Sequence, residues 1–310
     1  MEGSAGRDVV RRWAENPLIT IEDIPFRCSD IWNAGVVRLT GEHILLITVE
    51  SLRGTTAIYP ARSRDGRHFV VEPEALLGAT LEGPLLAYEN AGVRDARITP
   101  VDGTYYIAYL ADSDLGWRVG LARTDDFETV ERIGLVGEPD TKGGALFPEK
   151  IGGRFALLER PDPGVSIWIS YSDDLTFWGS STVVMTPRGG FWDSDRIGTA
   201  VPPIRVKEGW LLLYYGEKNT SAGPLVRLGA ALLDAEDPSC VVARSNIPIL
   251  APREKYERVG DVTNVVFSCG ALLEGEMLRI YYGASDSCIC LGTAKLNDVI
   301  AACLASQLEF

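Results

Sequence analysis

Residues 35–49 read GVVRLTGEHILLITV, an apolar strand that enters a polar, glycine-bearing turn and leaves as a longer apolar strand. The same pattern returns further along the chain as ARITPVDGTYYIAYL at 96–110, ALFPEKIGGRFALLE at 145–159, PPIRVKEGWLLLYYG at 202–216 and CGALLEGEMLRIYYG at 269–283. The turn glycines of the copies lie about 50 to 65 residues apart, a spacing typical of β-propeller blades rather than of βαβ units. The repeat therefore predicts an all-β fold, a five-bladed β-propeller.

The length and composition are those of a chain that folds as one unit. It has 310 residues and 46% hydrophobic content, enough to bury a large core, and no linker interrupts the repeat. We expect residues 17–310 to form a single propeller domain and residues 1–16 to form an N-terminal extension. Within the extension, Asp8 to Glu15 can form a short amphipathic helix, and from Leu296 onwards the strand pattern gives way to a second short helix.

The charge and the chain termini limit the partners. Lys and Arg number 30 against 43 Asp and Glu, for a net charge of −13, and no basic run offers a footprint for nucleic acid. The N-terminus lacks the apolar core of a secretory signal, and no stretch approaches the roughly 18 apolar residues of a membrane span. We therefore expect a cytoplasmic protein with neither nucleic acid nor membrane as partner. A homo-oligomer, with the N-terminal extension at a subunit contact, stays open.

Cysteine and histidine usage gives no sign of a metal or cofactor. The six cysteines form no CxxC pair and only two histidines exist, so a thiolate-histidine metal cluster is not expected. We interpret the cysteines as reduced, mostly buried residues, and no cofactor is implied.

Polar residues interrupt the apolar sequence in four segments beside the repeats. In GVRDARIT at 92–99, Asp95 is either one half of a surface ion pair or, at a propeller centre, a carboxyl group whose protonation is tuned by its neighbours. In residues 145–161, Glu159 ends an apolar strand and points either to solvent or into a site. The other candidates, suited to a hydroxyl-rich ligand or to ordinary sheet positions, are Lys150, Arg160, Arg196, Tyr215, Glu217, Asp261, Asn264 and Asp286.

Taken together, the motifs resemble glycoside hydrolase family 130. The motifs that carry the resemblance, in order, are GVRDARIT, ALFPEKIGGRF, RIGTAVPPI, GWLLLYYG, GDVTNVVFSCGALLEG and YYGASD. The resemblance extends from about Asn16 to about Leu296. It implies a five-bladed propeller and an inverting enzyme that acts on β-mannoside oligosaccharides. The family's usual GxEDPRIT places the proton donor at Asp95, with Arg94 and Ala96 replacing the usual Glu and Pro. The mannosyl ligands that it implies are Asn33, Glu50, Arg97, Asp261 and Asp286, with Tyr215 and Glu217 at the border of the site.

Most members of that family use inorganic phosphate as nucleophile, and this chain changes the basic residues that hold it. Where His-Arg-Pro is usual it has Glu159, Arg160 and Pro161. The usual Tyr-His-Gly reads Tyr-Tyr-Gly at 214–216, and the usual Arg-Val-Glu reads Thr-Val-Glu at 48–50. A carboxylate about 4 Å from phosphate would repel it by about 4 kcal/mol at an effective dielectric near 20.

The exchange at Glu159 therefore favours hydrolysis. In this hypothesis Asp95 protonates the leaving oxygen and Glu159 acts as the base that activates water, with the two carboxyls roughly 6.5 to 9.5 Å apart. The first alternative is a phosphorylase that releases mannose 1-phosphate and holds phosphate through Arg160 and Arg196. The second is a non-catalytic sugar-binding propeller.

Overall fold

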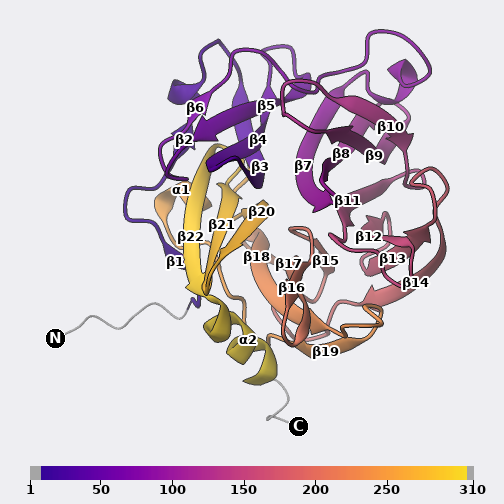
Figure 1. Cartoon of the computed structure of the whole chain (residues 1–310). Helices are drawn as coiled ribbons and strands as arrows, with labels where there is room; N and C mark the ends of the chain where they lie inside the picture. The colour runs from indigo at the N-terminus through magenta and orange to yellow at the C-terminus, as the bar shows by residue number, and fades with distance from the viewer. Residues whose placement is uncertain (1–7, 306–310) are drawn as a thin grey trace.

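The computed structural model describes residues 8–305, which form antiparallel sheets arranged around a common centre (Figure 1). Two 3-10 turns, Ile21–Asp23 and Leu86–Tyr88, and two short helices are the helical elements of this part of the chain. The helices are α1 (Lys255–Arg258) and α2 (Leu296–Leu304). The all-β prediction is confirmed.

The strands fall into antiparallel groups that follow one another in chain order. The first comprises β3 (Asp30–Leu39), β4 (Glu42–Glu50), β5 (Thr56–Ser63) and β6 (Val70–Val71). The second comprises β7 (Gly92–Val101), β8 (Thr104–Ser113), β9 (Gly116–Thr124) and β10 (Glu131–Leu135). The third comprises β11 (Thr141–Leu146), β12 (Phe155–Pro161), β13 (Ile167–Ser172) and β14 (Gly179–Met185).

The fourth group comprises β15 (Arg196–Thr199), β16 (Ile204–Val206), β17 (Gly209–Thr220), β18 (Gly223–Leu233) and β19 (Val241–Arg244). The fifth comprises β20 (Val266–Glu274), β21 (Met277–Ala284) and β22 (Cys288–Lys295), with β1 (Arg11–Arg12) and β2 (Ile19–Thr20) on the outer edge of β22.

One parallel contact joins the first two groups into a single hydrogen-bonded sheet. It is the pairing of Thr56 in β5 with Gly92 in β7. A Cβ atom at Gly92 would overlap the carbonyl oxygen of Thr56, and the backbone φ there is +113°, so only glycine fits this junction. If sheets are defined by hydrogen bonding, residues 8–305 therefore form four sheets. Their strands nevertheless make five antiparallel groups.

The hydrophobic cores lie between neighbouring groups. Ala156 and Leu158 of β12, for example, pack with Leu212 and Tyr214 of β17. Leu157, between Ala156 and Leu158, packs instead with residues of the second group, because successive side chains of a strand point to opposite faces. Each strand group is thus buried on both faces by its two neighbouring groups. This packing fixes its position relative to theirs.

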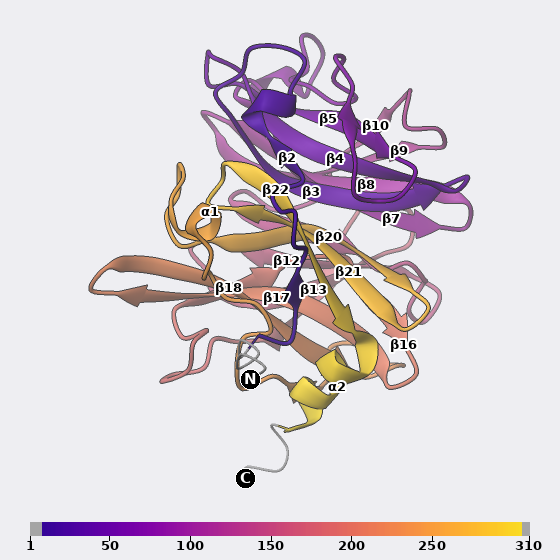
Figure 2. The ribbon, with the colours of Figure 1, turned by 90° about the vertical axis from the view of Figure 1, so that its left-hand side faces the viewer.

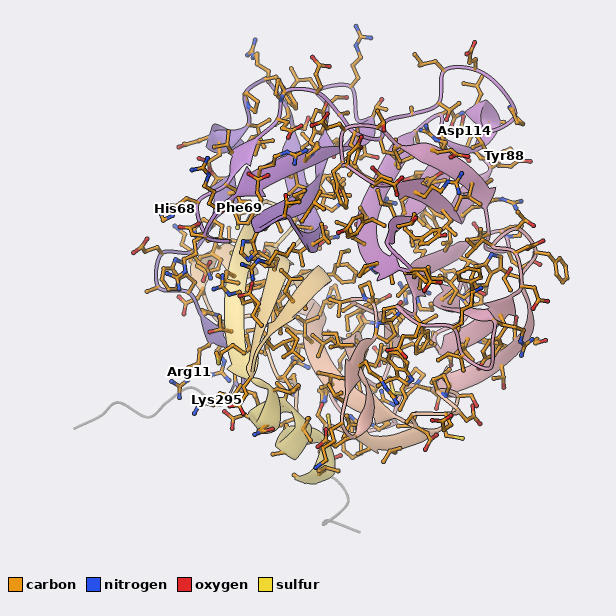
Figure 3. All side chains as sticks on the ribbon, viewed as in Figure 1. Arg11, His68, Phe69, Tyr88, Asp114 and Lys295 are labelled. Carbon is orange, nitrogen blue, oxygen red and sulfur yellow. The ribbon has the colours of Figure 1, made fainter. Side chains whose placement is uncertain are left out.

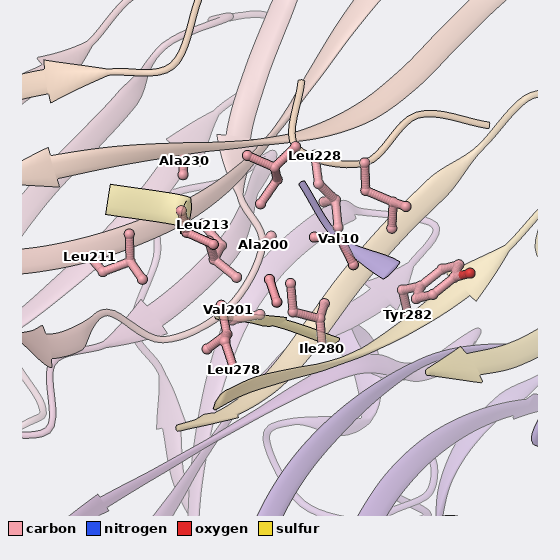
Figure 4. Packing of buried hydrophobic residues seen from close by; sticks show 14 of the residues in the cluster. Val10, Ala200, Val201, Leu211, Leu213, Leu228, Ala230, Leu278, Ile280 and Tyr282 are labelled. Carbon is pink, nitrogen blue, oxygen red and sulfur yellow. The ribbon is translucent and has the colours of Figure 1, made fainter. Parts of the chain in front are cut away.

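The N-terminal segment corrects the helix predicted for Asp8 to Glu15. Arg11 and Arg12 form β1 and pair with Thr293 and Gly292 of β22. Val10 is 2% exposed and packs in the cluster that also holds Leu228, Ile280 and Tyr282 (Figure 4). The segment is extended rather than helical because an extended backbone can pair with the edge of β22. In this conformation Val10 and Arg12 point inward and Arg11 points outward. Residues 8–16 therefore belong to the fifth group, which they follow along its edge (Figure 2); residues 1–7 lie outside the described part of the chain.

The helix predicted from Leu296 onwards is confirmed as α2. Its buried residues Val299, Ile300 and Cys303 pack against the core of the fourth and fifth groups. Among residues 8–305, no helix combines the length and the apolar character needed to cross a membrane.

The repeated turns gather at one end of the molecule. Residues close to these turns, including Arg38, Pro100, Pro148, Arg205 and Leu273, line one cavity of about 340 Å³. The first strands of the groups contact one another, β3 with β7 and β20, and β11 with β7 and β15. The starts of these strands, which carry the polar residues of the candidate site, are therefore at the opposite end.

Candidate active site

Asp95 projects from an irregularity in β7. The pairing of β7 with β8 shifts between Arg94 and Arg97, and Asp95 has a left-handed φ of 59°. Its N–H donates to Oγ1 of Thr48 at 3.0 Å, which holds the bulge against the first strand group. A β-bulge of this kind redirects a side chain out of the regular alternation. Asp95 is partly buried, so its carboxyl group is sheltered without being sealed from a ligand.

Asn33 occupies the matching position in the neighbouring first strand. It lies at the register shift of β3 against β4, has a φ of 45°, and donates from Nδ2 to Oδ1 of Asp95 at 2.7 Å. Its own Oδ1 is buried and has no hydrogen-bond partner among the described residues. The structure thus brings together two residues that the sequence placed in the site.

Arg97, expected as a mannosyl ligand, is committed to the protein backbone. Its guanidinium donates to the carbonyl oxygens of Asp95 at 3.0 Å, Ala200 at 2.8 Å and Thr199 at 3.2 Å. It is 2% exposed and lies 5.7 Å from the ring of Phe267. Arg97 therefore ties the Asp95 bulge to the fourth strand group, and few of its donors are left for a ligand.

Carboxylates gather beside Asp95. Asp286 lies in the turn between β21 and β22 with a φ of 48°. Burial, followed by the charges of Asp95 and Asp261, raises the pKa of Asp286 to about 7, an effect that Asp30 adds to and Arg94 opposes. Around neutral pH, Asp286 therefore exists partly as a neutral acid that can donate as well as accept a hydrogen bond.

Glu50, Asp261 and Asn264 border this group. Glu50, at the end of β4, lies opposite Asp30 of β3 in the strand register. Burial raises the pKa of Asp30, and the charges of Asp261 and Glu50 raise it further. Asp261 is exposed, and Asn264 has a left-handed φ of 60°. Both lie in the loop after α1.

Three basic side chains, Arg94, Lys142 and Arg160, also lie near Asp95. Burial, and then the charges of Arg94 and Arg160, lower the pKa of Lys142 in β11 to about 8, against the opposing charges of Asp162 and Asp95. Positive charges placed this close together make a site that favours an anion.

Arg160 links this basic cluster to the fourth group. It is 2% exposed, and its Nε donates to the hydroxyl of Tyr215 at 3.1 Å while Nη1 donates to the carbonyl of Gly164 at 2.9 Å. Arg196 of β15 pairs with Glu217 of β17 at 3.9 Å, with 40% of its own side chain exposed.

Glu159 points away from Arg160, as neighbouring residues of one strand must. Its Oε1 accepts a hydrogen bond from Ser170 of β13 at 2.7 Å, and Oε2 is buried without a partner in residues 8–305. Burial raises its pKa, and Glu138 adds to the shift. No recorded contact connects Glu159 with Asp95. The expectation that Glu159 faces Asp95 therefore finds no support in its contacts.

Lys150 lies at the wrong end of its hairpin for the expected role. The β11–β12 hairpin pairs Lys142 with Arg160 at one end and closes through the Ile151–Arg154 bridge at the other. At about 3.3 Å per residue, Lys150 is roughly 25 Å along the chain from Lys142. Its exposed ammonium lies 4.4 Å from the ring of Phe155, on the side of the repeated turns.

Two of the basic residues were not identified from the sequence as ligands. Lys142 lies over the ring of Trp117, 3.2 Å from its centroid. Arg94 pairs with Asp112 at 2.9 Å, and its Nε is buried without a hydrogen-bond partner among the described residues. The available signal was position, since Asn33, Asp95 and Lys142 each come one to three residues before a copy of the repeat.

Comparison with known proteins gives one consistent family. The family model described as beta-1,4-mannooligosaccharide phosphorylase matches residues 7–304. Beta-1,2-mannobiose phosphorylase of Listeria innocua is 38% identical, over 94% of this chain and 97% of that protein. Beta-1,4-mannooligosaccharide phosphorylase of Ruminococcus albus is 30% identical, over 95% of this chain and 90% of the relative.

A solved structure agrees with the sequence matches. The Listeria innocua beta-1,2-mannobiose phosphorylase in complex with beta-1,2-mannobiose superposes with a TM-score of 0.87 at 31% identity. The superposition covers 96% of this chain and 99% of the other. With the matched family model, these similarities show that the chain belongs to glycoside hydrolase family 130.

Proposed function

We propose that this protein is an inverting, inorganic-phosphate-dependent β-mannoside phosphorylase that releases mannose 1-phosphate. The observation that carries the proposal is the group of three cations, Arg94, Lys142 and Arg160, next to Asp95. Burial is the main cause of the lowered pKa of Lys142, and the charges of Arg94 and Arg160 add to it; a phosphate bound there would offset both effects. The relatives named above are phosphorylases, which agrees with this choice.

In the proposed reaction, a phosphate oxygen attacks the anomeric carbon of the mannosyl unit as the glycosidic C–O bond breaks. The leaving oxygen takes a proton that originates on Asp95, directly or relayed through the 3-hydroxyl of the same mannose. Attack from the opposite face inverts the configuration, so a β-mannoside yields α-mannose 1-phosphate and an oligosaccharide shorter by one unit. Lys142, Arg94 and Arg160 hold the negative charge of phosphate throughout.

Asn33 and Arg97 would act in this scheme by fixing Asp95, one through its carboxyl oxygen and the other through its backbone carbonyl. Asp286, Asp261 and Asn264 would bind hydroxyls of the mannosyl ring. A neutral Asp286 suits that task, because it both donates to and accepts from hydroxyl groups.

The hydrolase hypothesis depended on Glu159 as base. Its carboxyl group accepts a hydrogen bond from Ser170 and lies on the opposite face of β12 from Arg160, so neither activation of water near Asp95 nor repulsion of phosphate follows from its position. We therefore prefer phosphorolysis to the hydrolysis favoured by the sequence. A β-1,2 linkage is the first choice, since the 38% identical relative is named for that linkage.

We further propose that the five antiparallel strand groups are blades of a five-bladed propeller. In support, the cavity at the turn end is lined by residues of all five groups, for example Val36, Ile98, Pro148, Ile204 and Leu272. A ring of blades explains how residues from β3, β7, β11 and β12 and the β21–β22 turn gather near Asp95.

The test is turnover of β-1,2- and β-1,4-mannobiose by the purified protein with and without inorganic phosphate. We expect mannose 1-phosphate and mannose in equal amounts, only when phosphate is present, and their loss in Asp95→Asn. Mannose released at the same rate without phosphate would make the protein a hydrolase. Binding of the sugar without any turnover would make it a sugar-binding propeller.

A further inference from the structure

A buried ion pair joins the N-terminal strand β1 to helix α1, which precedes the loop of Asp261 and Asn264. Arg12 donates from Nε to Oε1 of Glu257 at 2.7 Å and from one terminal nitrogen to Oε2 at 2.9 Å. The same terminal nitrogen donates to the carbonyl of Ala251 at 2.6 Å, and the other one pairs with Asp8 at 2.9 Å. Arg253 also pairs with Asp8, at 2.9 Å, so the segment is anchored on both sides.

Glu257 is the centre of this network. It is fully buried in α1, and its oxygens also accept from the backbone N–H groups of Arg253 at 2.6 Å and Glu254 at 2.9 Å and from the hydroxyl of Tyr282 at 2.9 Å. Burial alone would raise the pKa of Glu257, but Arg12 and the two N–H groups outweigh it and lower the pKa. The carboxylate is thus kept charged by its partners.

The loop after α1, residues 259–265, carries Asp261 and Asn264. Its end is held by the N–H of Val265, which donates to the carbonyl of Glu257 at 3.1 Å. Its middle is held to the turn of Asp286: the N–H of Val262 donates to the carbonyl of Ser285 at 3.2 Å, and the N–H of Ser285 donates to the carbonyl of Val265 at 3.0 Å.

Close packing leaves this loop little freedom to adjust on its own. A Cβ atom on Gly260 would overlap the carbonyl oxygen of Ser285. At its far end, the carbonyl of Asn264 accepts from the N–H of Val226 in β18 at 3.1 Å. A displacement of α1 would therefore be passed to Asp261, Asn264 and the Asp286 turn together.

We propose that Arg12 is a positioning residue for the mannoside: through Glu257 it sets the place of α1, and with it the loop 259–265 and the Asp286 turn. The inference rests on the proposed function, since it takes Asp261, Asn264 and Asp286 as ligands of the sugar. The basic cluster for phosphate is on the second and third strand groups, outside this network. Arg12 should therefore affect the mannoside and leave phosphate binding unchanged.

The chain supplies a matched control in the preceding residue. Arg11 belongs to the same strand, yet its side chain is exposed at the outer edge of the molecule (Figure 3). The variants are Arg11→Gln, Arg12→Gln and Arg12→Lys. Arg12→Lys keeps the charge that compensates Glu257 and so protects folding, but an ammonium cannot reproduce the paired bonds of the guanidinium.

We expect Arg12→Gln to raise the KM for the mannoside about tenfold, and Arg12→Lys about threefold, with the KM for phosphate unchanged. Amide hydrogen exchange at Val262 and Val265 should be faster in both, and Arg11→Gln should match the wild type. A loss of thermal stability with wild-type mannoside KM and wild-type exchange in residues 259–265 would overturn the proposal, as would an equal rise of both KM values.

The exchange measurement separates this inference from the proposed function. Without any turnover by the wild-type protein, the function fails, while faster exchange in residues 259–265 of the Arg12 variants still supports the coupling between the N-terminal strand and the loop. Unchanged exchange in an active enzyme would reject the coupling alone.

Discussion

Asn33 and Asp95 extend from irregular points of two neighbouring first strands, and the amide of Asn33 donates to the carboxyl of Asp95 at 2.7 Å. Both residues have left-handed backbone angles, with φ of 45° and 59°. Such a conformation costs about 1–2 kcal/mol for a residue other than glycine, and asparagine and aspartate tolerate it best. The strain is held by tertiary bonds to Thr48 and Arg97, an arrangement common at functional sites.

The first prediction concerns this pair. Asn33→Gly removes the amide but keeps the backbone free to adopt its angle, so we expect kcat of phosphorolysis to fall about 10- to 100-fold because the carboxyl loses its fixed position. Initial rates at saturating phosphate measure this. Asn33→Ala should show the same kinetic loss and an additional loss of about 1 kcal/mol in the free energy of unfolding. Full kcat in Asn33→Gly would mean that the hydrogen bond does not position Asp95.

The second prediction concerns the basic cluster. Lys142→Met should raise the KM for phosphate about 10- to 100-fold, because a charge-assisted hydrogen bond to phosphate is lost, with a much smaller change in the KM for mannoside. Since the pKa of Lys142 is about 8, its charge is lost as the pH rises through that value. The wild-type KM for phosphate should therefore rise between pH 7 and pH 9, and more steeply than that of Lys142→Met.

Lys150→Met is the matched control, since it removes the same charge at the turn end of the same hairpin. Its KM for phosphate should equal that of the wild type. If Lys150→Met weakened phosphate binding and Lys142→Met did not, the site would have to lie at the end of the repeated turns.

The third prediction concerns Asp286 and pH. Its pKa is 3.8 in the reference state and about 7 in the fold, so folding favours its neutral form. The stability that this provides is complete below pH 4 and is lost as the pH rises through 7. Asp286→Asn mimics the neutral acid and tolerates the left-handed angle. We expect it to stabilise the ligand-free protein at pH 8 by on the order of 2–4 kcal/mol, and much less at pH 5.

Thermal or denaturant unfolding at the two pH values measures this difference. Asp261→Asn serves as the control, because Asp261 is exposed and should give a smaller change. An increase in stability that is the same at pH 5 and pH 8 would contradict a carboxyl strained by burial and by Asp95. A lower kcat/KM in the more stable Asp286→Asn variant would mark a residue kept for function at a cost in stability.

The repeat in the sequence predicted the strands well because it is a local signal. Residues 35–49 appear as the greater part of β3 and β4 with the turn between them, and α2 begins at Leu296 as expected. The helix predicted at Asp8 to Glu15 was wrong because local periodicity cannot reveal a free strand edge. Only the folded chain presents β22 as a partner for Arg11 and Arg12.

The site was predicted less completely, for two physical reasons. A sequence motif identifies the strand on which a residue lies but not the face of the sheet to which its side chain points. Glu159 and Arg160 are neighbours in sequence and therefore point to opposite faces of β12. A motif also gives no distance along a hairpin, which is why Lys150 was grouped with residues at the other end. Asn33 and Asp95 were identified through the family resemblance; both stand where a repeat begins, and Lys142, which satisfies the same condition, was missed because the resemblance did not point to it.

The last prediction separates the two chemistries proposed for this chain. Glu159→Gln keeps the shape of the side chain and its contact with Ser170, and burial already disfavours the charged form of this carboxyl. We therefore expect kcat and both KM values to stay within about twofold of the wild type, because removing an interaction that is absent from the transition state leaves the rate unchanged. A general base would behave differently, since its loss lowers the rate about 10²- to 10⁴-fold. A fall of that size, measured with mannobiose in the absence of phosphate, would restore Glu159 as the base that activates water.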